Sequence, residues 1–317
     1  MAINSKVQNQ TIAILMATFN GSKYIENQIL SLQQQTYKNW KLYIQDDGST
    51  DDTLNIIKKI MSYDERINIV SNGKTKQGAG KNFLSLSENI DSDYAIFCDQ
   101  DDIWLENKVS DMVAYANSFN LSISVKPSIV YADGYAFYDN DGEIDFSGIS
   151  HNHADSLKDF LFFNGGYQGC SILFNRAMIS FIKNYKGYIH LHDDIVSLAA
   201  HALGHVYFLP KKLMLYRQHS NAVTGTKSFK NSLISKMFSN VNYLLSKKHY
   251  NVKESFYRNY GHLLSPENKK TFEYYIKFCT SKSFVKEAKI LFIGGFRINK
   301  SKMKLYSKFL LRRKFDE

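Results

Sequence analysis

The chain has 317 residues, 44% of them hydrophobic, which is enough to bury one large core or one domain with an extension. Its three cysteines are widely spaced and form no CxxC pair, which argues against a disulfide framework and against a cysteine zinc site. The formal net charge of +10 arises from one part of the chain only. Residues 1–226 carry 19 Lys and Arg against 24 Asp and Glu, whereas residues 227–317 carry 21 against 6.

The N-terminal residues and the apolar stretches bear on the location of the protein. Residues 1–10 are polar and lack the apolar region of a signal peptide. The longest apolar stretches are far shorter than the about 20 residues that span a bilayer. Widely spaced, odd-numbered cysteines suit a reducing compartment. We therefore expect a soluble or surface-bound cytoplasmic protein.

The first part of the chain repeats a pattern of strand, polar loop and helix. Residues 11–17 form an apolar run of strand length, which Thr18-Phe19-Asn20-Gly21 ends before a helical pattern begins near Ser22. Residues 40–44 alternate like a second strand and end in the polar segment 45–51, before a second helical pattern. This alternation predicts a parallel sheet covered by helices, with ligands bound at the carboxyl ends of the strands.

An acidic run, Asp99-Gln100-Asp101-Asp102, directly follows residues 94–98, which are apolar and indicate a buried strand. Carboxylates at the end of a buried strand repel one another and are costly to desolvate. A divalent cation that holds a diphosphate explains the cluster, because hard cations bind carboxylate oxygens and share their remaining sites with phosphates. The alternative is a solvated turn, in which Asp is common.

The middle of the chain contains further strands and a second acidic motif. We predict a strand at residues 129–132, a hairpin turn at residues 140–142, and a strand at residues 172–174 after the glycine-rich segment 164–171. Leu191-His192-Asp193-Asp194-Ile195 precedes a helical pattern. An acidic residue at a helix N-terminus often serves only as a cap, and this alternative stays open.

Residues 227–317 interleave Lys with Phe, Tyr, Leu and Ile, and we expect them to form a basic, mainly helical extension of a domain that comprises residues 1–226. A basic, aromatic-rich segment can lie on an anionic membrane surface, which is our first interpretation. A helical subdomain with a solvated basic face is the alternative. No nucleic-acid motif accompanies the charge, so we expect no nucleic-acid partner.

Three motifs occur in order along the chain: Ala17-Thr18-Phe19-Asn20-Gly21, Asp46-Asp47-Gly48-Ser49-Thr50-Asp51 and Cys98-Asp99-Gln100-Asp101-Asp102-Ile103-Trp104. Together they resemble glycosyltransferase family 2, and the resemblance covers about residues 11–222. It implies an α/β protein of the GT-A fold, which has a Rossmann-like, mostly parallel central sheet with helices on both faces. It also implies an inverting enzyme that uses a nucleotide-sugar donor.

The resemblance implies roles for individual residues in donor and metal binding. The residues expected to bind the donor are Thr18, Asn20, Asp47, Lys81, Asn82 and Asp99. Asp47 matches an aspartate that contacts the base, and a carboxylate accepts the imide N–H of uracil or thymine. Mg²⁺ or Mn²⁺ is expected on Asp101 and Asp102, with His219 as a further candidate ligand. The sequence leaves open which carboxylate of the acidic run contacts the metal.

The resemblance also implies a general base, Asp193, which would take the proton from the acceptor hydroxyl as this attacks the anomeric carbon. Asp194 stays open as the alternative base. Tyr167 and Gln168, in the glycine-rich segment, are candidates for acceptor binding. An ordinary tight turn is the alternative for that segment.

Residues 216–225 are similar to a pattern of bacterial rhamnosyltransferases within this family. We therefore predict an inverting, metal-dependent glycosyltransferase of cell-surface polysaccharide biosynthesis. It would move rhamnose from dTDP-rhamnose to a glycan acceptor that is linked to a lipid at the inner membrane face. A UDP-hexose or UDP-N-acetylhexosamine is the second choice of donor. A nucleotidyltransferase and an inactive sugar-nucleotide binder are the alternatives from other classes.

Overall fold

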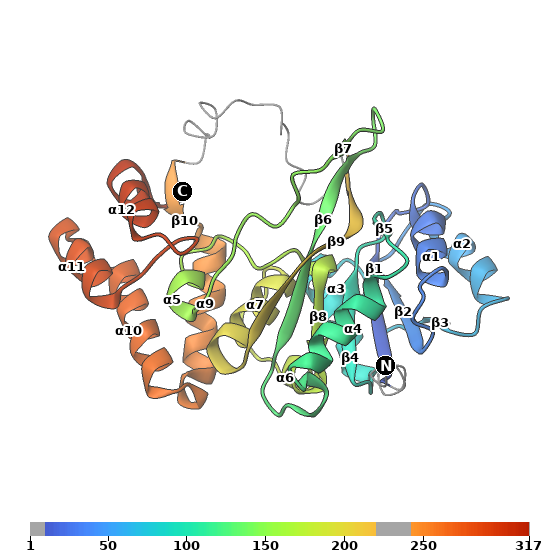
Figure 1. The fold of residues 1–317 in the computed structure, drawn as a ribbon, viewed down its shortest axis with the longest axis horizontal. Coiled ribbons are helices and arrows are strands. Elements are labelled where there is room, and N and C mark those ends of the chain that lie inside the picture. Colours follow the sequence, from blue (N-terminus) through green and yellow to red (C-terminus); the bar gives the residue numbers. More distant parts are fainter. Residues whose placement is uncertain (1–9, 220–241, 317) are drawn as a thin grey trace.

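The computed structural model describes residues 10–219 and 242–316, and a nine-stranded sheet forms its centre (Figure 1). The strand order is β3-β2-β1-β4-β8-β6-β9-β5, and β7 pairs with β6. These strands are β1 (Ile12–Thr18), β2 (Trp40–Asp46), β3 (Ile67–Ile69), β4 (Tyr94–Cys98), β5 (Ile103–Trp104), β6 (Ile129–Tyr138), β7 (Ile144–Asp145), β8 (Ile172–Asn175) and β9 (Val206–Gln218). A second, two-stranded sheet pairs β10 (Tyr243–Leu245) in parallel with β11 (Arg313–Phe315).

The direction of the strands brings their carboxyl ends together. β3, β2, β1 and β4 are parallel neighbours. β8 is antiparallel to both β4 and β6, so β6 runs in the direction of β4, and β9 pairs with β6 in parallel. In this register Thr18 lies beside Asp46, and Met16 lies beside Cys98. The polar residues that follow β1, β2, β4, β6 and β9 therefore meet at one edge of the sheet.

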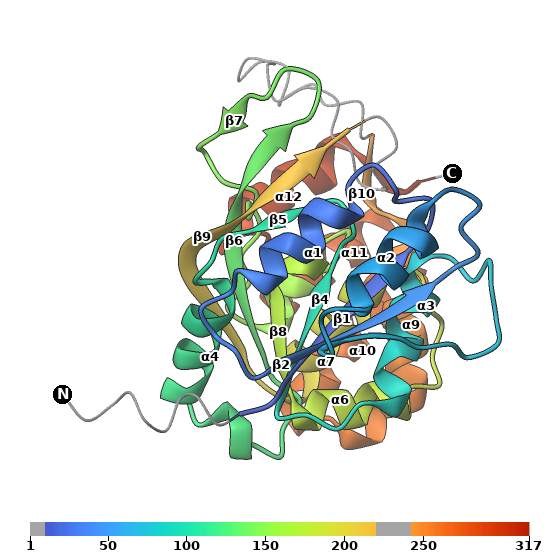
Figure 2. The same cartoon turned by 90° about the vertical axis from the view of Figure 1, so that its right-hand side faces the viewer.

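Helices cover both faces of the sheet (Figure 2). The side chains of β1 alternate between two buried layers, since Ala13 and Leu15 belong to one and Ile12, Ile14 and Met16 to the other. Side chains of α3, α6 and α7 complete the first layer, and those of α1, α2 and α4 complete the second. The helices of this part are α1 (Ile25–Gln33), α2 (Thr53–Met61), α3 (Ala79–Leu86), α4 (Lys108–Ser118), α5 (Leu157–Phe160), α6 (Arg176–Lys183) and α7 (His192–Leu203), with short 3₁₀ helices η1 (Ser87–Asn89), η2 (Leu121–Ile123) and η3 (Gly169–Ser171).

The predicted fold class is confirmed, and two local predictions need correction. The expected hairpin is present, because β7 pairs antiparallel with β6. The strand predicted at residues 129–132 continues to Tyr138, because β6 passes through irregular pairing at Asp133 before it resumes. The first helix begins at Ile25 rather than near Ser22.

The C-terminal extension is mainly helical, as predicted, and occupies one end of the molecule (Figure 1). Its aromatic side chains, among them Phe256, Phe272 and Phe278, belong to the same buried cluster as Leu15 of the central sheet. Lys253 is buried, and its ammonium donates to the carbonyls of Leu161 (2.9 Å) and Phe163 (2.5 Å). The helices are α9 (Lys247–Tyr260), α10 (Pro266–Thr280), α11 (Phe284–Gly294) and α12 (Lys302–Leu311), with η4 (Gly261–Leu263).

The predicted domain boundary after residue 226 lies outside the described residues and stays a prediction. The core that the extension shares with the sheet has a practical consequence. Removing the extension would expose the apolar layer against which α9 and α10 pack. Among residues 10–219 and 242–316, no helix is both long enough and apolar enough to cross a bilayer.

Candidate active site

The loops after β1 and β2 are bound together by side chains at the edge of the sheet. Asp46 accepts hydrogen bonds from the Thr18 hydroxyl (2.9 Å) and from the backbone N–H of Ser49 (2.7 Å). The Asn20 side chain accepts from the N–H of Thr50 (2.9 Å), and Asn20 itself has a left-handed backbone with φ of 46°. Thr18 and Asn20 thus lie at the predicted edge, where their side chains fix the shape of the two loops.

Asp47 connects the loop after β2 to the start of α3. It is buried, and its two carboxylate oxygens accept from the N–H groups of Gln77 (2.8 Å) and Gly78 (2.9 Å). Each carboxylate oxygen has a second lone pair, so a further N–H donor can still be bound. Asp47 therefore holds the start of α3 and keeps the capacity to accept one further hydrogen bond.

The two predicted donor residues on α3 differ in their surroundings. Asn82 is buried and donates to the carbonyl of Gln45 (3.0 Å), which fastens α3 to β2. Lys81, its neighbour, is exposed. Gly80 packs against the segment before α7, where a Cβ atom would lie 2.5 Å from the carbonyl oxygen of His190. This close approach places the start of α3 beside the start of α7, which carries the second acidic motif.

The acidic run after β4 is fixed by Gln100, a residue to which sequence reasoning gave no role. Its amide donates to the carbonyl of Phe19 and accepts from the N–H of Phe19, both at 3.0 Å. The acidic run is thereby joined to the loop after β1. A spacing of 81 residues separates the two partners, and a single Gln between aspartates carries no signal of such a contact.

Asp99 and Asp102 form the most strongly perturbed part of the site. Asp102 is 1% exposed, and while one of its oxygens accepts from the N–H of Arg217 (3.1 Å), the other has no partner. Burial, followed by the charge of Asp99, raises the pKa of Asp102 well above its ordinary value. Burial and the charge of Asp101 raise the pKa of Asp99 to about 7. The positive charge of Lys108 lowers the pKa of Asp99 but does not offset the effect of burial.

The side chains around the acidic run can hold a divalent cation. Of the predicted metal ligands, Asp102 lies in one group of side chains, whereas Asp101 and His219 lie in another. Ligand atoms of Asp99, Asp102 and Cys170 all lie within 4.8 Å of one another. Asp101 instead faces His219, whose Nε2 lies 2.8 Å from a carboxylate oxygen of Asp101. The buried, unpartnered oxygen of Asp102 and the raised pKa values of Asp99 and Asp102 fit a bound cation, whose positive charge would stabilise the ionised carboxylates.

Arg217 holds the acidic run from the side of β9. Its guanidinium donates to the carbonyl of Asp101 (2.7 Å) and to the carboxylate of Asp139 (2.7 Å). Asp139 also accepts from Lys23 and from the Tyr24 hydroxyl, both at 2.7 Å. These donors, the Lys23 ammonium first, hold the pKa of Asp139 well below its usual range. Arg217 and Asp139 were not among the predicted site residues, although Arg217 lies within the rhamnosyltransferase-like segment.

A buried lysine lies near the acidic run. The Lys108 ammonium donates to the carbonyl of Cys170 (2.7 Å) and lies 3.8 Å from the centre of the Trp104 ring. Burial lowers its pKa, while the charges of Cys170, Asp102, Cys98 and Asp99 oppose that shift. No sequence pattern indicated a buried lysine here, because the other inward residues of its helix are apolar.

The second acidic motif begins α7, and its two aspartates have different partners. Asp194 is buried, with a carboxylate oxygen 2.6 Å from Nδ1 of His249 in α9. Asp193 is half-buried and accepts from the N–H of Asp194 (2.9 Å). Burial raises the pKa of Asp193 strongly, with smaller contributions from the charges of Asp194 and Asp99. The contribution of Asp99 to the raised pKa of Asp193 indicates that the second acidic motif lies near the first.

Of the two predicted acceptor residues, Tyr167 lies in the core and Gln168 is half-buried. Tyr167 is buried, stacks on Tyr131 with ring centres 3.8 Å apart, and shares a hydrogen bond with His201 (2.8 Å). The structure therefore does not bring Tyr167 to the edge of the sheet. Gln168 is half-buried, and its carbonyl accepts from the N–H of Ser171 (2.9 Å). The glycine-rich segment instead supplies Cys170 to the acidic site.

Comparison with known proteins gives the family. Residues 13–180, more than half of the chain, match the family described as Glycosyl transferase family 2. The chain belongs to this family. It is 32% identical over 228 residues to the dTDP-rhamnosyl transferase RfbG of Shigella flexneri, which covers 68% of this chain and 75% of RfbG.

Two further similarities extend this result. The chain is 27% identical over 154 residues, 47% of each protein, to the GalNAc(5)-diNAcBac-PP-undecaprenol beta-1,3-glucosyltransferase of Campylobacter jejuni. Its fold resembles the crystal structure of S. aureus TarS 1-349 in complex with UDP-GlcNAc, with a TM-score of 0.56, 13% identity, and 90% of this chain and 79% of that chain covered. The protein is a glycosyltransferase of the GT-A fold, so the nucleotidyltransferase and the inactive binder are not retained.

The family match covers only part of the candidate site of this glycosyltransferase. It includes Asp47 and the acidic run at residues 99–102, and it ends at residue 180. Asp193 and His219 lie beyond it, so their roles depend on the geometry alone. Residues 220–225 of the rhamnosyltransferase-like segment lie outside the described residues.

Proposed function

We propose that this glycosyltransferase moves rhamnose from dTDP-rhamnose to a lipid-linked glycan, with inversion at the anomeric carbon, and that it requires Mg²⁺ or Mn²⁺. One observation carries the proposal: the glycine-rich segment that supplies Cys170 to the acidic run also packs against the start of α7, where a Cβ atom on Gly166 would clash with the carbonyl oxygen of Asp193. A donor diphosphate held at the acidic run would thus present its sugar to Asp193.

Donor binding would use the carboxyl edge of the sheet. Asp47, beside the start of α3, would accept a hydrogen bond from the thymine or uracil N–H, and Lys81 would face the diphosphate. Asp99 and Asp102 would hold the metal, with Asp101 and His219 adjacent to them. The cation, when bound, supplies positive charge that offsets the charge developing on the departing nucleoside diphosphate.

Asp193 would act as the base. The acceptor hydroxyl oxygen forms a bond to the anomeric carbon while the bond from that carbon to the diphosphate oxygen breaks, and the hydroxyl proton passes to the Asp193 carboxylate. One displacement gives inversion. Burial raises the pKa of Asp193, which makes its ionised carboxylate a stronger proton acceptor and supports this role. The pairing of Asp194 with His249 supports Asp193 over Asp194.

The donor and acceptor are inferred from the relatives. The name of RfbG supports dTDP-rhamnose as donor. The name of the Campylobacter relative supports an undecaprenol-linked acceptor, and the glucosyl transfer that it names agrees with a hexose donor as the second candidate. A lipid-linked acceptor agrees with the proposed location at the cytoplasmic face of the inner membrane, as part of cell-surface polysaccharide synthesis.

A thermal-shift screen tests this proposal. A ligand that binds only the folded protein raises the unfolding midpoint by mass action. We expect dTDP to raise it in the presence of Mn²⁺ and to have little effect with EDTA, with UDP second and GDP without effect. Stabilisation by UDP alone would transfer the proposal to a UDP-sugar, and no stabilisation by any nucleoside diphosphate would contradict it.

A further inference from the structure

α11 and α12 of the C-terminal extension expose an unusual number of large apolar side chains. Among the described residues, eighteen large apolar side chains are exposed, and seven of them lie on these two helices. Their exposed fractions range from 52% to 84%. These residues are Phe284, Val285, Phe292, Ile293, Met303, Leu310 and Leu311. We call this set the apolar face.

The apolar face follows the geometry of its helices. On α11, Val285, Phe292 and Ile293 recur at the helical spacing, opposite the buried Leu291. On α12, Met303 and Leu310 are seven residues apart, whereas Leu305 and Phe309 face inward. Phe284 stacks on Phe309, with ring centres 4.8 Å apart and planes inclined by 11°, and so joins the two helices. This contact links the exposed residues of α11 to α12 and to its packed interior.

Positive charge surrounds the apolar face. Residues 282–315 include eleven Lys and Arg and one acidic residue, Glu287. Glu287 is buried and pairs with the Lys314 ammonium at 2.6 Å, so it offers no negative charge to a partner. Lys286 and Lys289 on α11 and Lys304 on α12 are exposed. A surface that is both apolar and uniformly basic complements a surface with an apolar interior and an anionic rim.

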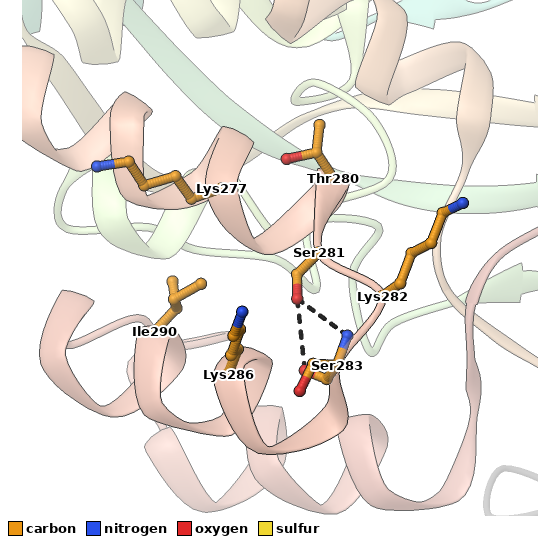
Figure 3. Close-up of a pocket in the computed structure, with 7 residues that line it drawn as sticks. All are labelled: Lys277, Thr280, Ser281, Lys282, Ser283, Lys286 and Ile290. Atoms are coloured by element: carbon orange, nitrogen blue, oxygen red, sulfur yellow. Dashed lines mark hydrogen bonds between the residues drawn. The ribbon is translucent and has the colours of Figure 1, made fainter.

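A basic hollow of about 480 Å³ lies between α10 and α11, next to the apolar face (Figure 3). Its polar lining consists of Lys277, Thr280, Ser281, Lys282, Ser283 and Lys286. In Figure 3 the Lys286 side chain extends into the space between the two helices. Ammonium and hydroxyl groups are the donors that a phosphate requires, and no carboxylate lines the hollow to oppose one.

We propose that the apolar face and the basic hollow form a docking surface for a bilayer that contains anionic phospholipids. The apolar side chains would enter the boundary between headgroups and acyl chains, and the hollow would hold a lipid phosphate. The inference rests on the proposed function in one respect, which is that a lipid-linked acceptor gives the enzyme a reason to be at a membrane. α12 lies toward the end of the molecule at which β6 and β9 end (Figures 1 and 2). Docking there would bring the carboxyl edge of the sheet toward the acceptor.

Sedimentation of the full chain with lipid vesicles tests the docking surface. We expect binding to phosphatidylcholine vesicles that contain phosphatidylglycerol, much weaker binding to phosphatidylcholine alone, and a decrease with added salt. F292S/L310S/L311S should weaken binding at least about tenfold. K286Q/K289Q/K304Q should weaken it about a hundredfold, since each basic residue near an anionic surface contributes roughly a fivefold factor.

Two matched controls carry equivalent changes elsewhere on the surface. I123S/V125S removes two exposed apolar side chains near η2, and K38Q/K58Q/K59Q removes three exposed lysines near α1 and α2. Both controls should bind vesicles as the unchanged protein does. All variants change exposed side chains, and circular dichroism with a thermal midpoint shows whether each is folded.

Three results would overturn the docking surface. The first is equal binding by the controls and the α11–α12 variants. The second is equal binding to neutral and anionic vesicles. The third is a dimer in light scattering that F292S/L310S/L311S dissociates, without vesicle binding, which would make the apolar face a contact between copies of the chain. If vesicles bind but no nucleoside diphosphate stabilises the protein, the proposed function fails while the docking surface stands.

Discussion

Nδ1 of His249 lies 2.6 Å from a carboxylate oxygen of Asp194, and this contact joins the C-terminal extension to the helix that begins at the proposed base. Asp194 in turn donates its backbone N–H to the Asp193 carboxylate (2.9 Å). The extension thus contributes to the position of Asp193, although it lies outside the part of the chain that matches the family. Asp194 and His249 are 55 positions apart, and no sequence pattern indicated that their two segments are in contact.

His249→Ala should lower kcat about tenfold and leave the dissociation constant of dTDP with Mn²⁺ unchanged within a factor of two. The physical reason is that a buried carboxylate loses its hydrogen-bond partner, so the first turn of α7 is held less firmly. Steady-state kinetics and calorimetric titration measure the two quantities. His262→Ala, which changes a histidine of η4 in the same extension, is the control. A raised KM with unchanged kcat would show that His249 does not position the base.

Arg217→Lys should weaken Mn²⁺-dependent binding of dTDP or UDP at least about tenfold. Lysine keeps the charge, but it cannot donate simultaneously to Asp101 and Asp139 in the geometry of the guanidinium. Titration calorimetry with and without metal measures the effect. Arg258→Lys, at an exposed pair with Glu254, should have no effect. Unchanged nucleotide affinity in Arg217→Lys would show that the acidic run keeps its shape without Arg217.

Lys108→Met should destabilise the protein by about 3 kcal/mol, because it leaves a buried carbonyl without its donor and removes positive charge near buried carboxylates. Urea unfolding measures the free energy of unfolding, and Lys38→Met at an exposed position is the control. A loss below about 0.5 kcal/mol would contradict the role given to Lys108.

The contribution of Asp99 to stability without metal should fall as the pH rises from about 4 to about 7, against the opposite contribution of His192 and His201, whose pKa values burial lowers to about 3. The pKa of Asp99 is raised to about 7 in the folded protein, so between these values the folded state retains a proton that the unfolded state has released. Through Asp99, each increase in pH therefore favours the unfolded state until this carboxyl is ionised in both states. Thermal unfolding across this range in EDTA should show the decrease as the difference between the unchanged protein and Asp99→Asn.

Mn²⁺ should reverse this dependence, since a cation stabilises the ionised form of the acidic run. The apparent affinity for Mn²⁺ is expected to increase through about pH 7. A stability profile that metal leaves unchanged would mean that Asp99 and Asp102 do not form the cation site.

The sequence predicted those parts of the fold whose residue patterns lie within one short stretch of the chain. β1, β2 and β4 are apolar runs that end in polar residues, so the edge with Thr18, Asp47 and the acidic run could be located from the pattern alone. The same reasoning stopped at Asp133, because an Asp-Gly pair interrupts the apolar pattern of β6 while the pairing resumes beyond it.

The contacts that were missed join distant segments. Arg217 reaches Asp139 across 78 residues and Asp101 across 116, and nothing local to any of them indicates the partner. Tyr167 was assigned to the acceptor because tyrosine suits a sugar surface, but the same ring also suits the core, where it stacks on Tyr131. Sequence pattern locates the ends of strands, and tertiary packing decides which side chains remain available there.

The measurement that tests the central claim most directly compares Asp193→Asn with Asp194→Asn in transfer and in nucleotide binding. Asp193→Asn should lower kcat by about a thousandfold, within the range attributed to a general base, and leave the affinity for dTDP with Mn²⁺ unchanged. Asp194→Asn should lower kcat only about tenfold. Unchanged turnover in Asp193→Asn, or loss of nucleotide binding with it, would contradict the assignment of Asp193 as the base.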